Sequence, residues 1–136
     1  MYPPELVAPM KLELENVGFT SLVTANEVEE AVKKEGTTLV VVNSVCGCAA
    51  GAARPGVIHS IKGAKAPSNL VTVFAGVDRE ATDTAREFMV PFPPSSPSIA
   101  LFKDGNLVHM LERHHIEGRP AEAIAANLAA AYEEFC

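Results

Sequence analysis

The 136-residue sequence predicts an α/β fold in which helices cover both faces of a central β-sheet. Residues 37–43 form a continuous run of apolar and β-branched side chains, which is typical of a strand buried on both faces. Residues 70–75 form a second run of this kind. Apolar residues with helical spacing come before, between and after these strands, so helices are expected to pack on the sheet.

The N-terminal part of the chain predicts two helices before the first strand. Residues 4–17 carry apolar side chains every three to four positions and define a helical extension over residues 1–20. Asn26 and Glu29 have the spacing of a capping pair for the next helix, and Gly36 ends it.

The middle of the chain predicts two more helices, each following a strand. A helix of small residues begins near Gly47, and Pro55 is expected to kink or break it. Asp78 can cap the helix that follows the second strand. The whole chain, residues 1–136, is expected to form a single domain.

The C-terminal part predicts an irregular connection, a hairpin and a last helix. Residues 91–97 hold four prolines and cannot form a regular element. Residues 99–102 and 107–111 are expected to pair through an Asp-Gly turn, because that dipeptide favours tight hairpins. Residues 120–135 form the last helix, with proline in its first turn.

Composition narrows the classes of function. The chain has 17 acidic and 11 basic residues, a formal charge of −6, and the basic residues are scattered. Such a surface is a poor partner for nucleic acid or an anionic membrane. No apolar run approaches the roughly 20 residues of a membrane helix, and no signal peptide is recognisable. Three cysteines without a leader are typical of a reducing compartment, so the cytoplasm is expected.

Cys46-Gly47-Cys48 places two thiols at the point where a buried strand ends and a helix begins. Unpaired N–H groups and the helix dipole at such a position stabilise a thiolate, which is the nucleophile in disulfide exchange. The pattern therefore predicts thiol redox chemistry. The structural alternative is two small buried residues at the end of a strand.

The segment from Ser96 to Gly105 resembles the thioredoxin segment in which a cis-proline opens a strand ending in Phe-Lys-x-Gly. The closer resemblance is to the bacilliredoxin family, formerly described as disulfide isomerases, and it covers nearly the whole chain. The matching segments are Val41 to Gly51, Ala53-Arg54-Pro55, Val73 to Gly76, Pro94 to Ser98, Arg113-His114, Ile116 to Gly118 and the terminal Cys136.

This resemblance implies a thioredoxin-like fold, with a mixed sheet and an extra N-terminal helix. It implies a thiol–disulfide oxidoreductase that removes bacillithiol, a low-molecular-weight thiol, from client proteins carrying it as a mixed disulfide. Cys46 would attack, and Cys48 or an external thiol would resolve the adduct. Gly47, Ser96 and a cis Pro97 facing the cysteines would position the substrate. No metal or organic cofactor is implied, and the small thiol is the co-substrate.

The chain departs from ordinary thioredoxins in two ways. They have Cys-x-x-Cys, and they carry an acidic residue six positions before the first cysteine, where this chain has Val40. A Cys-x-Cys disulfide also closes a tighter ring, and strain makes such a pair more oxidising. Thiol transfer or disulfide shuffling is therefore expected rather than general disulfide reduction. A protein disulfide isomerase is the alternative within redox chemistry.

Other residues give weaker signals. A metal- or cluster-binding protein using the same cysteines is the alternative of another class, with His114 or His115 as a further ligand, but a structural zinc usually needs four ligands and C-x₂₋₄-C spacing. Either histidine could instead tune a thiolate or simply be a polar strand end. Arg54 lies too far along the helix to pair with a thiol, so packing or a surface role is expected, with carboxylate binding as the alternative. Cys136 is an exposed terminal thiol or a redox partner.

Overall fold

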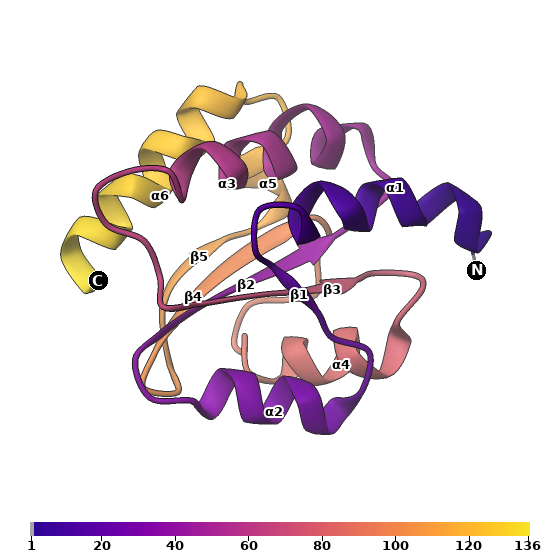
Figure 1. Ribbon diagram of the computed structural model, residues 1–136, viewed down its shortest axis with the longest axis horizontal. Helices are drawn as coiled ribbons and strands as arrows, with labels where there is room; N and C mark the ends of the chain where they lie inside the picture. Colours follow the sequence, from indigo (N-terminus) through magenta and orange to yellow (C-terminus); the bar gives the residue numbers. More distant parts are fainter. Residues whose placement is uncertain (1) are drawn as a thin grey trace.

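The computed structural model describes residues 2–136, and its centre is a five-stranded mixed sheet (Figure 1). In spatial order the strands are β1 (Thr20–Ser21), β3 (Asn69–Phe74), β2 (Thr37–Asn43), β4 (Ser98–Lys103) and β5 (Asn106–Leu111). Strands β1, β3 and β2 run parallel, whereas β4 and β5 pair antiparallel. The predicted strands are confirmed, and the two-residue β1 is an addition that the sequence analysis did not contain.

Helices cover both faces of the sheet, as predicted (Figure 1). The helices are α1 (Pro4–Glu15), α2 (Ala25–Lys33), α3 (Arg54–Ser60), α4 (Arg79–Glu87), α5 (Arg113–Ile116) and α6 (Ala121–Phe135). Leu39 and Val41 of β2 belong to one apolar core together with residues of α3 and α6. Val40 and Val42 point to the other face and pack with residues of α2 and α4. Successive side chains of β2 therefore enter two cores, which explains its unbroken apolar run.

The helix that follows the cysteine pair is irregular. Residues 47–48 are helical, Ala49–Ala53 form a π-helical turn, and α3 begins at Arg54. Pro55 lies in the first turn of α3. Proline lacks an N–H group and clashes with the carbonyl of the preceding turn, so the wider turn before it accommodates the ring. The predicted break at Pro55 thus takes the form of a π-helical turn.

Helix α3 packs very closely on α6 at Gly56. A Cβ atom at this position would lie 2.7 Å from Cβ of Ile124 and 3.1 Å from the carbonyl oxygen of Ala121. Only a glycine allows this approach, since real Cβ atoms do not come so near to other carbon atoms. The contact fixes α3, and with it the start of the helix that carries the thiols.

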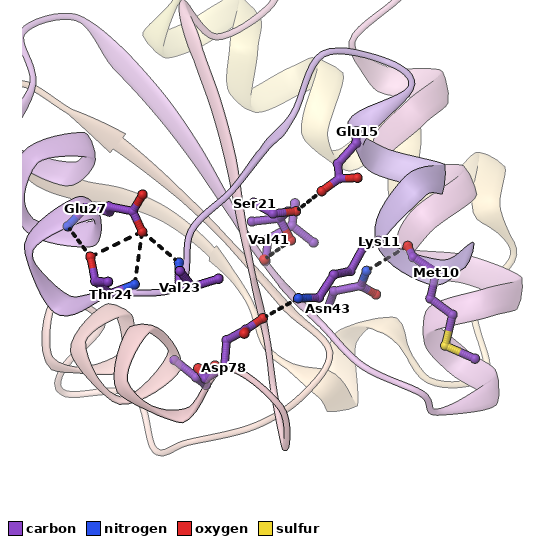
Figure 2. A network of polar contacts seen from close by, with 12 residues as sticks. Met10, Lys11, Glu15, Ser21, Val23, Thr24, Glu27, Val41, Asn43 and Asp78 are labelled. Carbon is purple, nitrogen blue, oxygen red and sulfur yellow. Dashed lines mark hydrogen bonds and ion pairs between the residues drawn. The ribbon is translucent and has the colours of Figure 1, made fainter. Parts of the chain in front are cut away.

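The start of α2 differs from the prediction. Thr24, not Asn26, is the N-cap, and its side chain and that of Glu27 form a reciprocal capping box (Figure 2). Asn26 lies inside the helix, where its amide donates to Glu30, so the predicted pair of Asn26 with Glu29 is wrong.

The proline-rich connection contains two cis peptide bonds, Val90-Pro91 and Ser96-Pro97. The cis bond at Pro97 confirms the prediction made from the thioredoxin resemblance, and the one at Pro91 was not predicted. Among residues 2–136, no helix has both the length and the apolar character that crossing a membrane requires.

Candidate active site

Cys46 and Cys48 lie just beyond the carboxyl end of β2, and their sulfur atoms are 2.6 Å apart. The N–H of Cys48 points to Sγ of Cys46 at 3.4 Å, and the N–H of Cys46 donates to Oγ of Ser44 at 2.9 Å. Gly47 is the first helical residue, and the N–H of Ala49 closes the turn on the carbonyl of Cys46 at 2.9 Å. The two thiols lie at the start of a helix, as the sequence predicts, and they are in direct contact.

The two thiols have opposite acid–base character. The pKa of Cys46 is lowered, first by the hydrogen bond from the Cys48 thiol, then by the Cys48 N–H, and further by the charge of Arg113. The pKa of Cys48 is raised, first by burial and then by its hydrogen bond to Cys46 and the repulsion between the two sulfur atoms. These opposite shifts favour the thiolate at Cys46 over the thiolate at Cys48.

A buried arginine, Arg54, makes hydrogen bonds to the residues that precede the cysteine pair. Arg54 is 2% exposed, and its Nη1 donates to Oδ1 of Asn43 at 3.0 Å and to the carbonyl of Ser44 at 2.9 Å. Its Nε lies 3.1 Å from a carboxylate oxygen of Glu13, in an ion pair without hydrogen-bond geometry. The packing role expected for Arg54 is confirmed, because a guanidinium with these partners orders the residues that lead into Cys46.

Helix α1 closes the same end of the sheet (Figure 2). The amide of Asn43 donates to the carbonyl of Met10 at 3.1 Å, and Lys11 forms an ion pair with Asp78 at 2.7 Å. Asp78 is the N-cap residue of α4, as predicted, but its side chain makes no capping hydrogen bond. Its carboxylate serves a long-range contact to α1 instead.

The loop before β4 lies next to the loop that carries the cysteines, at the same end of the sheet. Ser98 pairs with Val42, which places the cis Pro97 beside the end of the strand that leads into Cys46. Arg113 makes two hydrogen bonds to this loop. Its backbone N–H donates to Oγ of Ser95 and its Nη1 donates to the carbonyl of Ser96, both at 3.3 Å. The site thus consists of two neighbouring loops with a cation at their junction.

Arg113 belongs to a segment that resembles the family, but no role in the site was predicted for it. Leu111 pairs with Ile99, so Arg113, two positions after Leu111, falls opposite Pro97, two positions before Ile99. The predicted Asp-Gly turn alone would instead place Glu112 opposite Pro97. A β-bulge between Leu101 and Phe102, which was not predicted, shifts the register by one residue.

The two histidines do not join the cysteines. His114 and His115 lie in α5, where Nδ1 of His115 accepts from the N–H of Glu112, the residue that precedes the helix. Glu112, His114 and His115 have potential ligand atoms within 4.8 Å of one another, and neither cysteine belongs to this group. A zinc site built from the cysteine pair and a histidine therefore has no geometric support among residues 2–136.

Cys136 is exposed at the end of α6. The C-terminus and the end of β2 lie on opposite sides of the molecule (Figure 1). The terminal thiol is therefore separated from the cysteine pair within one chain.

Comparison with known proteins gives consistent results for sequence and fold. Residues 2–136 match the family model described as disulphide isomerase. A bacilliredoxin of Cytophaga hutchinsonii is 63% identical over 134 residues, covering 98% of this chain and 99% of the relative. A bacilliredoxin of Halalkalibacterium halodurans is 54% identical and covers 99% and 94%.

Two solved structures share the fold at low sequence identity. Mitochondrial thioredoxin 3 of Saccharomyces cerevisiae in its oxidised form has a TM-score of 0.58 and 20% identity, covering 90% of this chain and 98% of the other. Thioredoxin O2 of Arabidopsis thaliana in its oxidised state has a TM-score of 0.59 and 14% identity, covering 86% and 96%. The predicted thioredoxin-like fold is thereby confirmed.

Proposed function

This chain belongs to the bacilliredoxin family and is a thiol–disulfide oxidoreductase, and we propose that it removes the small thiol bacillithiol from protein mixed disulfides through Cys46 and Cys48. The contact between two thiols of opposite acid–base character carries this proposal. In this proposal Cys46 attacks as a thiolate, while Cys48 stays protonated until the second step.

In the first step, the Cys46 thiolate attacks the sulfur of the small thiol in the mixed disulfide. A bond forms between this sulfur and Cys46, the bond to the client breaks, and the client leaves as a thiolate that takes up a proton. The N–H of Cys48 supports the attacking sulfur. In this proposal Gly47, Ser96 and Pro97 position the incoming chain beside the pair.

In the second step, Cys48 loses its proton and attacks Cys46. The small thiol leaves as a thiolate, and a Cys46–Cys48 disulfide remains, which an external thiol reductant returns to two thiols with two electrons. Because Cys48 already touches Cys46, its attack has a large effective concentration. The other route is resolution of the adduct by an external thiol.

The proposed setting follows from this chemistry. The partners are S-thiolated client proteins and the small thiol, in the reducing cytoplasm. The cysteine pair needs no metal or organic cofactor, because the electrons come from thiols. Disulfide isomerisation is the second candidate, favoured by the description of the matching family model.

The test uses a client protein that carries bacillithiol on one cysteine, with intact masses followed over time. All proteins carry Cys136→Ser, which removes the exposed third thiol. We expect the parent protein to release the client and the small thiol and to become two hydrogens lighter. Cys48→Ala should keep the small thiol on Cys46, and Cys46→Ala should be inactive.

Three results would change the proposal. De-thiolation by Cys46→Ala at the parent rate would remove Cys46 from the nucleophile role. Full turnover of Cys48→Ala in the presence of external thiol would assign the second step to that thiol. Refolding of a client with scrambled disulfides, without de-thiolation, would favour the isomerase.

A further inference from the structure

Arg113 is an exposed cation beside the loop of the cis Pro97, in a protein with a net charge of −6. Its side chain is 44% exposed, whereas Arg54 is buried. The pKa of Arg113 is raised, first by its hydrogen bond to Glu117 and then by the charges of Cys46 and Cys48. The charge of Arg113 thus acts on both sulfur atoms, and it also attracts an anionic group that comes close to them.

The guanidinium of Arg113 is positioned by hydrogen bonds that occupy only some of its N–H donors. Nε and Nη2 donate to one oxygen of Glu117 at 3.2 and 3.0 Å, and Nη1 donates to the carbonyl of Ser96 at 3.3 Å. A guanidinium has five N–H donors, so one on Nη1 and one on Nη2 have no partner among residues 2–136. Two such donors match the two oxygens of a carboxylate.

A helical surface pair with Glu117 does not account for this arrangement. Exposed pairs four residues apart contribute little to stability. The pair of Arg113 with Glu117 also does not explain why the Arg113 side chain donates to the Ser96 carbonyl, or why the Arg113 backbone N–H donates to Ser95. These contacts place the charge at the loop that lies beside the end of β2, where it acts on the reacting sulfur.

We propose that Arg113 binds a carboxylate of the small thiol, so that the preferred substrates are mixed disulfides of carboxylate-bearing thiols. This inference rests on the proposed function and assigns the residue that selects the small thiol. The carboxylate lies on the free donors of Arg113 while its sulfur meets Cys46. Glu117 competes for the same guanidinium and weakens this binding.

The experiment uses three symmetric disulfides that differ in charge: the anionic 3,3′-dithiodipropionate, the neutral 2-hydroxyethyl disulfide and the cationic cystamine. The Cys46 thiolate attacks one sulfur, the Cys46–S–S–R bond forms, and the other half leaves as a thiolate. A Cys48→Ala, Cys136→Ser parent retains the adduct, so its rate of formation follows from intact mass. The rates with two probes depend equally on the ionised fraction of Cys46, so their ratio is independent of that fraction.

In Arg113→Gln, we expect the ratio of the anionic to the neutral probe to fall about tenfold, as for loss of a charge-assisted hydrogen bond. Arg113→Lys should keep most of the ratio, and Glu117→Gln should raise it. Arg119→Gln is the matched control, because it removes the same charge from an exposed position. Its ratio should stay at the parent value.

Equal loss of rate for all three probes in Arg113→Gln would overturn the inference, because Arg113 would then act only on the thiolate. An unchanged ratio would overturn it as well. Failure of the parent to form any adduct would instead contradict the proposed function, so the two failures are distinguishable.

Discussion

Two arginines lie near the cysteine pair and differ in burial. The comparison shows that the same type of side chain can serve structure when it is buried and substrate binding when it is exposed. Arg54 lies beneath the loop, 2% exposed, and bonds the residues that lead into Cys46. Arg113 is exposed, bonds the neighbouring loop and still has donors left. The buried guanidinium builds the site, whereas the exposed one is available to a substrate.

Substitutions of Arg54 and Arg113 differ in whether the acceptors that lose their donor are reached by water. Without Arg54, buried acceptors lose their partner and water cannot replace it. Without Arg113, solvent reaches the Ser96 carbonyl and Glu117, so the fold loses little. We therefore expect Arg54 to affect stability and Arg113 to affect chemistry.

The largest expected effect is on stability. Arg54→Met keeps the length of the side chain but leaves the Ser44 carbonyl buried without its donor. We expect a loss of about 2–4 kcal/mol in the free energy of unfolding. Urea unfolding of the reduced protein measures it, with Arg113→Met as the control at about 0.5 kcal/mol or less. Similar losses for both variants would remove the distinction.

The second effect concerns the acidity of Cys46. Its hydrogen bond with the Cys48 thiol is the largest cause of its lowered pKa, and the Arg113 charge is a smaller one. Cys48→Ala should therefore raise the pKa of Cys46 more than Arg113→Gln does. The pH dependence of alkylation at Cys46, read by peptide mass spectrometry, gives both values. The reverse order would assign the thiolate mainly to the arginine.

The smallest effect is a pH-dependent difference in stability. Arg113 lowers the pKa of Cys46 in the folded state below its unfolded value, so its stabilisation requires the thiolate. This contribution is present above the unfolded pKa and is lost as pH falls through the folded pKa. Arg113→Gln should match the parent at pH 5.5 and be less stable at pH 9.5, in urea titrations of the reduced proteins. A constant difference at both pH values would contradict the electrostatic origin.

The sequence predicted the strands well, because β2 is buried on both faces and its apolar run has only one interpretation. The cap of α2 was harder. Thr24 with Glu27 and Asn26 with Glu29 have the same spacing, and local pattern alone does not rank them. A long-range bond from the Ala25 N–H to Glu80 favours the earlier start.

The site was predictable to the extent that it is local. Cys46, Gly47 and Cys48 follow one another, and Pro97 belongs to a recognisable segment, so the chain identified them without a structure. The roles of Arg54 and Arg113 depend on contacts across ten or more positions. The role of Arg54 depends on its contacts with Asn43, Ser44 and Glu13. The position of Arg113 depends on the β-bulge that shifts the register between β4 and β5.

The close packing at Gly56 restricts the paths that evolution can take. A methyl group there would collide with Ile124, and the helix leading from the thiols would be pushed off α6. The atom met first is Cβ of Ile124, which every residue except glycine carries, and the carbonyl oxygen of Ala121 lies 3.1 Å away. A smaller side chain at position 124 therefore does not make room, and a larger residue at position 56 requires the backbones of α3 and α6 to move apart. Substitutions on the exposed side of α6 leave this contact, and with it the path of the helix that leads from the thiols, unchanged.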